Sequence, residues 1–131
     1  MILELELPYP PSVNHYKKAG RIVKTAAGKL YQQRVNTDET KTFYFQVYIL
    51  TKKLIPAEWP KSCDKATFSL KIYVYPPDGK KRDLDNILKV LIDSLVRAHI
   101  IKDDSQVCRL YVEKCDIIKN GKVLVRIEEV E

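Results

Sequence analysis

The 131-residue sequence has no apolar run near the roughly 18 residues that a membrane-spanning helix requires. Its 4 glycines and 7 prolines are too few for a linker-like or collagen-like chain. Glu4 and Glu6 stand near the N-terminus, where a secretory signal needs a basic flank and a long apolar core. We therefore expect a cytoplasmic protein without a membrane partner.

Cysteine and histidine are also scarce. The 3 cysteines, Cys63, Cys108 and Cys115, leave one unpaired under any disulfide scheme, and reduced thiols agree with a cytoplasmic location. The chain lacks a C-x-x-C motif, and His15 and His99 are its 2 histidines. A structural zinc site is therefore not supported.

The residues that are present can fill a core and bind an anion. Hydrophobic residues make up 45% of the chain, which is enough for one domain over residues 1–131. The net charge is +6, and residues 14–34 contain six basic residues and no acidic one. A second basic run covers residues 80–82. Such cations form a solvated surface or displace counterions from phosphates, and charge alone does not decide between these roles.

Alternation of apolar and polar residues predicts strands at residues 2–7 and 66–75. Residues 106–117 and 122–130 are also predicted to be strands. They are joined through Asn120 and Gly121, a dipeptide that indicates a β-hairpin. Residues 12–27 show no clear period and are predicted to form a loop, with a short strand at Arg21–Lys24.

Residues 84–97 repeat apolar side chains at three- and four-residue steps, which predicts a helix with Asp83 or Asp85 as its N-cap. Residues 28–54 contain no proline and are predicted to be mainly helical, although their Thr- and Tyr-rich middle also fits a strand. Two main helices with four or five strands predict an α+β fold, with a small mixed sheet.

Asp83 and Asp85 stand two residues apart, between a basic turn and the predicted helix. In an extended segment their carboxylates project to one side, where they repel unless a cation binds or the helix is capped. Mg²⁺ favours one or two carboxylates together with waters and substrate phosphates. Helix capping and the helix dipole are the simpler explanation of an isolated pair. An EF-hand is excluded, because its glycine and distal glutamate are missing.

Lys89 and a second acidic pair extend this pattern. Lys89 follows Asp85 by four residues, so it forms an ordinary ion pair or stabilises a phosphoryl transition state. Asp103 and Asp104 follow the helix, where the chain turns back toward the strands. They belong to a solvated turn or complete a metal site of three or four carboxylates. Acids among cations are consistent with a metal held beside a polyanion.

The ordered combination of these motifs resembles the RusA family of Holliday-junction resolvases, found in bacteria and prophages. The resemblance rests on Arg82-Asp83-Leu84-Asp85-Asn86 with Lys89, on Asp103-Asp104, and on the opening Leu7-Pro8-Tyr9-Pro10-Pro11-Ser12-Val13-Asn14. It spans nearly the whole chain and is weakest over residues 35–65. It implies a RusA-like fold for residues 1–131.

The resemblance implies a homodimeric, Mg²⁺-dependent endodeoxyribonuclease that resolves four-way DNA junctions by paired symmetric nicks in recombination and repair, with Mn²⁺ as a substitute. By position, Asp83, Asp85 and Asp104 match the family's metal-binding catalytic carboxylates, and Lys89 matches its essential lysine. Asp104 matches better than Asp103.

A set of polar and basic residues is predicted to contact branched DNA: Asn14, Tyr16, Lys17, Lys18, Arg21, Lys81, Arg82 and Asn86, with His15 beside them. Tyr16 stacks on an exposed base or is an ordinary surface tyrosine. A substrate with two symmetric cuts suits a C2 dimer, with strand edges or the apolar part of residues 40–55 as candidate interfaces.

Two alternatives remain. The first is a DNA-binding module without catalysis, in which the aspartates act as caps. The second is a less selective Mg²⁺ nuclease for flaps or other branched DNA. A D-x-D sugar-nucleotide transferase is disfavoured, because the chain is short and lacks a Gly-rich phosphate loop.

Overall fold

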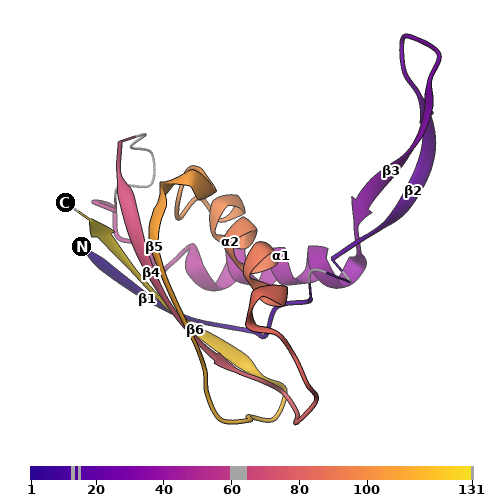
Figure 1. Ribbon diagram of the computed structural model, residues 1–131. Helices are drawn as coiled ribbons and strands as arrows, with labels where there is room; N and C mark the ends of the chain where they lie inside the picture. Colours follow the sequence, from indigo (N-terminus) through magenta and orange to yellow (C-terminus); the bar gives the residue numbers. More distant parts are fainter. Residues whose placement is uncertain (13, 15, 60–64, 131) are drawn as a thin grey trace.

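A four-stranded sheet carries two helices on one face (Figure 1). A two-stranded arm, formed by residues 17–36, projects away from the sheet and the helices. The computed structural model describes residues 1–12, 14, 16–59 and 65–130. The sheet order is β1-β6-β4-β5, with β1 (Ile2–Leu7), β4 (Thr67–Tyr75), β5 (Val107–Lys114) and β6 (Lys122–Val130). β4 is parallel to β5, and the other pairs are antiparallel. The α+β prediction is confirmed.

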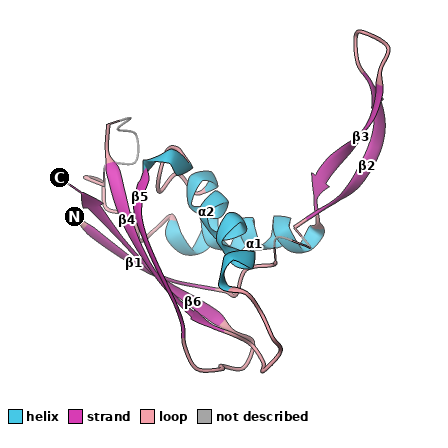
Figure 2. Ribbon diagram, in the orientation of Figure 1, coloured by secondary structure: helices cyan, strands magenta, loops and turns pink. Residues whose placement is uncertain are grey.

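The sheet buries the face that the sequence periodicity predicts. On β1, Leu3, Leu5 and Leu7 are buried, while Glu4 and Glu6 are exposed on the opposite face. The helices α1 (Asp38–Thr51) and α2 (Leu88–Arg97) cover the apolar face (Figure 2). α2 follows the short 3₁₀ helix η1 (Leu84–Ile87), and together they form the parallel crossover from β4 to β5. The strands predicted at 2–7 and 66–75 and the helix at 84–97 are confirmed.

The predicted hairpin between the last two strands is wrong. β5 and β6 both form, but β4 lies between them, and the connection crosses the end of β4. The backbone N–H of Cys115 donates to the carbonyl of Val74 at 2.7 Å. Asn120 and Gly121 do adopt positive φ angles, of 69° and 66°, so the tight turn exists without the pairing. β6 takes the central position because it carries the regular apolar face, while the mostly exposed β5 suits an edge.

The helix predicted over 28–54 begins ten residues late. Residues 30–36 instead form β3 (Leu30–Asn36), which pairs with β2 (Lys17–Lys24), so 12–27 is also more ordered than predicted. Gly28, at a φ of 85°, reverses the chain between these strands. Thr37 then caps α1 by accepting a hydrogen bond from the backbone N–H of Thr40 at 3.2 Å. The N-cap fixes where the helix begins.

Trp59 anchors the segment after α1 to the core. Its side chain is 3% exposed, stacks on Phe68 at a centroid distance of 5.7 Å, and donates from Nε1 to the carbonyl of Ile100 at 2.8 Å.

Among the helices that the structure describes, none has the length and the apolar character of a membrane-spanning segment. Val13, His15 and Cys63 lie outside the described residues.

Candidate active site and nucleic-acid interface

Asp83 and Asp85 lie where the basic loop at residues 80–82 leads into η1, and both side chains are exposed. Asp83 occupies the N-cap position of η1, and its carbonyl accepts the backbone N–H of Asn86 at 3.2 Å. Its carboxylate makes no capping hydrogen bond, and α2 has no side-chain cap either. Helix capping therefore does not account for this aspartate pair, and the two carboxylates remain available to a ligand.

The second acidic pair divides into two different roles. Asp103 caps the 3₁₀ helix η2 (Asp104–Gln106), because its carboxylate accepts the backbone N–H of Ser105 at 3.0 Å and also the Ser105 hydroxyl. These hydrogen bonds hold the pKa of Asp103 below its usual value. Asp104 is exposed, and within the described residues its carboxylate accepts no such hydrogen bond. Asp104 is thus the member of the pair that is open to a ligand.

Gln106 fixes the backbone around Asp104, and sequence reasoning missed it. The side chain is 6% exposed, and its Oε1 accepts the backbone N–H of Lys102 at 2.8 Å and that of Asp103 at 3.1 Å. Its Nε2 donates to the carbonyl of Ala66 at 3.1 Å. The S/T/D-x-x-E/Q capping signature, here Asp103 with Gln106, was the signal that could have identified it.

Lys89 and Asp104 line one hollow of about 360 Å³. The ammonium of Lys89 pairs with Asp93 at 3.1 Å, one helical turn later, rather than with Asp85. The hydrogen bond to Asp93 and its charge raise the pKa of Lys89, and the charge of Asp104 acts in the same direction. A lysine whose ammonium form is favoured by its neighbours therefore stands beside an open carboxylate.

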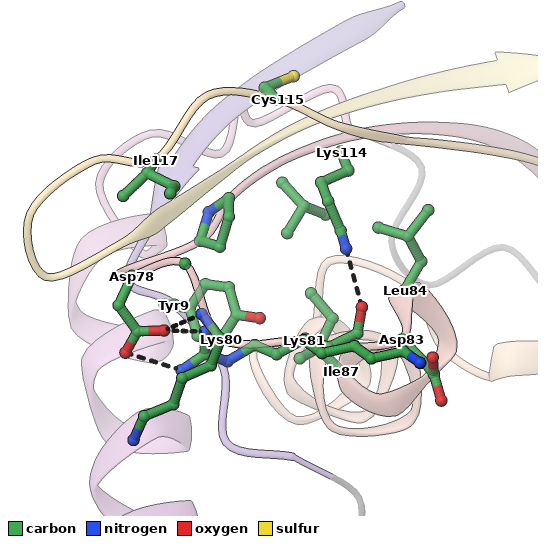
Figure 3. A pocket seen from close by; sticks show the side chains of 14 residues that line it. Tyr9, Asp78, Lys80, Lys81, Asp83, Leu84, Ile87, Lys114, Cys115 and Ile117 are labelled. Carbon is green, nitrogen blue, oxygen red and sulfur yellow. Dashed lines mark hydrogen bonds and ion pairs between the residues drawn. The ribbon is translucent and has the colours of Figure 1, made fainter.

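The basic loop before Asp83 is held by an ion pair that the sequence did not reveal (Figure 3). Both terminal nitrogens of Arg82 donate to the carboxylate of Asp78, and the Arg82 guanidinium lies 5.9 Å from the ring centroid of Tyr9. Lys114 donates to the carbonyl of Arg82 at 2.8 Å. In this conformation Arg82 orders the loop, and its predicted contact with DNA remains a prediction.

Two further hollows flank this loop. One, of about 260 Å³, is lined by Tyr9, Lys81, Asp83 and Lys114, and Asp83 lies across it from Asp78 (Figure 3). The other, of about 470 Å³, is lined by Lys81, Asp83 and Asn86. Asp83 thus borders both spaces with cationic neighbours, which suits a phosphate backbone.

The three predicted metal ligands do not converge into a closed cage. Within residues 1–12, 14, 16–59 and 65–130, no three His, Cys, Asp or Glu side chains lie close enough together to hold a metal ion. Asp83 borders the two hollows beside the basic loop, while Asp104 lines the hollow that contains Lys89. The donor chemistry still fits Mg²⁺, which needs only one or two carboxylates when waters and phosphates complete its shell.

The predicted DNA-binding residues near the N-terminus lie just before the arm and along its first strand, β2. Asn14 is exposed, and Lys18 and Arg21 are exposed on β2. Tyr16 is half-buried against the core, with the ammonium of Lys17 at 5.5 Å from its ring centroid. Base stacking by Tyr16 would therefore use one remaining ring edge or face, whereas the lysines and Arg21 project from an extended ribbon.

The pairing of Asp78 predicts how its contribution to stability depends on pH. Arg82 and the backbone N–H of Lys80 hold the pKa of the Asp78 carboxyl at about 2, below its ordinary 3.8. A lowered folded-state pKa stabilises the fold above the unfolded-state value, and that stabilisation is lost as pH falls through the folded-state value. The charged pair therefore stabilises the fold at neutral pH and loses its effect between about pH 4 and pH 2.

We expect Asp78→Asn to lower the free energy of unfolding by the same amount at about pH 7 and about pH 5, and by progressively less below about pH 4. Urea unfolding of the two proteins across this range measures the difference. A difference that stays constant down to pH 2 would mean that packing, rather than the carboxylate charge, accounts for the effect.

Comparison with known proteins matches nearly the whole chain to one protein family. Residues 8–128 match the sequence model of the family described as endodeoxyribonuclease RusA. Over 127 residues the chain is 32% identical to the crossover junction endodeoxyribonuclease rusA of Enterobacteria phage HK97, 30% to that of Shigella sonnei (strain Ss046) and 28% to that of Escherichia coli (strain K12). Each comparison covers 95% of this chain and 92% of the relative.

Proposed function

Because this chain belongs to the RusA family of endodeoxyribonucleases, we propose that it resolves four-way DNA junctions by paired symmetric nicks and acts as a homodimer with Mg²⁺. The observation that carries the proposal is the family match over residues 8–128, which includes every one of the open carboxylates. Exposed acids beside a basic loop, together with basic residues on the arm, support the same chemistry. Recombination and repair are the processes that such an activity serves.

We propose that Asp83, Asp85 and Asp104 supply the carboxylates for metal binding, one or two of them to an ion, because their oxygen donors suit a hard divalent cation such as Mg²⁺ or Mn²⁺. When bound, the ion would polarise the scissile phosphate and lower the pKa of a bound water. The open position of each carboxylate supports the assignment, because none is consumed by a capping hydrogen bond. The DNA phosphate itself would complete the set.

The other residues bind and orient the DNA. Lys89, kept protonated by Asp93, would stabilise negative charge on the departing 3′ oxygen, so that products carry 5′-phosphate and 3′-hydroxyl ends. Lys81 and Asn86 would hold the phosphates that flank the cut. Lys18 and Arg21 on the arm would contact phosphates farther along the strand.

The test uses a labelled synthetic four-way junction, a flap and a linear duplex, each incubated with Mg²⁺ or with EDTA. We expect symmetric nicks that a ligase can seal, formed only with Mg²⁺ and only in the junction. Equal cutting of the flap would replace the proposal with a less selective branched-DNA nuclease. Tight binding without any cutting would replace it with a non-catalytic binding module.

A further inference from the structure

The arm carries two exposed apolar side chains close to its tip. Ile22 on β2 is 69% exposed, and Leu30 on β3 is 65% exposed. Both lie near the turn at Gly28, in the part of the arm that projects farthest from the sheet and the helices (Figure 1). Single exposed apolar residues are ordinary on a protein surface, so the arrangement of these two decides whether they have a use.

Ile22 and Leu30 project from the same face of the arm. In the antiparallel pairing Ile22 stands opposite Gln32, and Lys24 stands opposite Leu30. Residues directly opposite each other share a face, and so do residues two apart on one strand. Leu30 is therefore a diagonal neighbour of Ile22, at roughly 7–8 Å, which two large side chains can bridge. We call these two residues the tip pair.

A β-bulge turns Ile22 onto this face. The pairing register shifts just before Ile22, where two residues of β2 stand opposite one residue of β3. Without the shift, Ile22 would stand opposite Tyr31 and point away from Leu30. Gly20 lies in the bulge, where an added Cβ would be 2.9 Å from a side-chain carbon of Val35. Glycine allows this close approach, so the local sequence directs Ile22 toward Leu30.

Cations surround the tip pair, and the arm contains no acid. Residues 17–36 include six basic residues and no acidic one. Lys24 shares the face of the tip pair, and Arg34 also lies on that face because it stands two residues from Gln32. A protein partner of mixed charge gains little from so many cations. DNA neutralises them with its phosphates, and its bases offer apolar faces to the tip pair.

We propose that the tip pair is a wedge that inserts between the bases at the branch point of DNA, while the cations around it bind the flanking phosphates. Proteins that kink DNA insert Leu and Ile side chains between base steps in this way. A branch point interrupts base stacking, and unstacking costs least where pairing or stacking is already incomplete. The inference rests on the proposed function for its substrate and adds the step that opens the branch point.

The first test records base unstacking without cutting. A four-way junction carries the fluorescent adenine analogue 2-aminopurine beside its branch point, and the protein is added in EDTA. We expect the unmodified chain to raise the fluorescence, because stacking quenches this base. A chain with both Ile22→Thr and Leu30→Thr should lose most of the rise. Threonine suits a strand and every cation remains, so the dissociation constant should stay within about threefold.

Tyr31→Thr is the matched control for this double variant. Tyr31 is 47% exposed and directly follows Leu30, but it pairs with Val23 and therefore lies on the other face of the arm. We expect the fluorescence rise of this variant to equal that of the unmodified chain. An equal loss in Tyr31→Thr would assign the unstacking to the other face and overturn the wedge.

A second substrate separates a lost wedge from a damaged arm. With Mg²⁺, the double variant should cut a fully paired junction roughly tenfold more slowly than the unmodified chain does. It should cut a junction with mismatched bases at the branch point at nearly the unmodified rate, because little stacking remains to be broken. Equal slowing on both junctions would mean that the tip pair acts in another way, and would overturn the wedge.

Two further results would contradict the wedge: no fluorescence change when the unmodified chain binds, or an unchanged rise with the double variant. An unmodified chain that cuts the junction without unstacking the base rejects the wedge and leaves the proposed function standing. One that unstacks the base but cuts nothing rejects the activity and leaves the wedge standing.

Discussion

Asp104→Asn is expected to reduce the rate of junction cutting by roughly 10²–10³-fold, which corresponds to about 3–4 kcal/mol of lost transition-state stabilisation. The change keeps the size of the side chain and removes the negative charge that we assign to the metal. Because Asp104 is exposed and does not cap η2, folding should be unaffected. Single-turnover cleavage of a labelled junction measures the rate, and a gel shift in EDTA measures binding separately.

The neighbouring Asp103 supplies a matched control. Asp103→Asn keeps a side chain that caps a helix nearly as well, so the backbone around η2 should persist. We expect this variant to cut within a few-fold of the unmodified rate. Equal losses for both substitutions would show that the turn as a whole is needed, and a normal rate for Asp104→Asn would remove Asp104 from the site.

The second large effect is on stability and concerns Trp59. Replacing a buried tryptophan by alanine typically costs about 3–5 kcal/mol, from lost burial and from the cavity left behind. Trp59 adds a stacking contact with Phe68 and a hydrogen bond to the carbonyl of Ile100. Ile100 begins the connection that leads to Asp104, so Trp59→Ala should loosen both the core and the approach to the site.

Urea unfolding, followed by circular dichroism, measures this cost. Trp59→Phe separates its parts: the ring can still stack on Phe68, while the carbonyl of Ile100 loses its partner at a cost of about 1–3 kcal/mol. A Trp59→Ala protein within about 0.5 kcal/mol of the unmodified stability would behave like a surface substitution and contradict this role.

Sequence periodicity was sufficient where a segment buries one face. β1, β4 and α2 were predicted because their apolar residues repeat with the period of a strand or a helix. A different local signal, the spacing and type of the charged residues, identified the acidic motifs and Lys89. Their assignment to a metal and to catalysis stays a prediction, which Asp104→Asn tests for one of them.

Local signals failed where distant segments decide the outcome. The Asn120-Gly121 turn formed, yet its flanking strands were separated, because β6 buries a regular apolar face and inserted between β1 and β4. Residues 30–36 lacked proline and resembled a helix, but the Gly28 turn and the Thr37 cap left them to pair with β2. Strand order and strand pairing are long-range properties, which a local pattern does not contain.

The sequence by itself therefore determined the residue types of the candidate site, the principal helix beside it and the α+β class. Apart from the capping signature of Asp103 with Gln106, which is present in the sequence, only the tertiary structure decided which of those residues are open. In the folded chain Asp103 caps η2, whereas Asp104 is exposed. Arg82 pairs with Asp78, and Lys89 lines the same hollow as Asp104. The physical reason is that hydrogen bonds and ion pairs depend on distances between side chains, which exist only after the chain has folded.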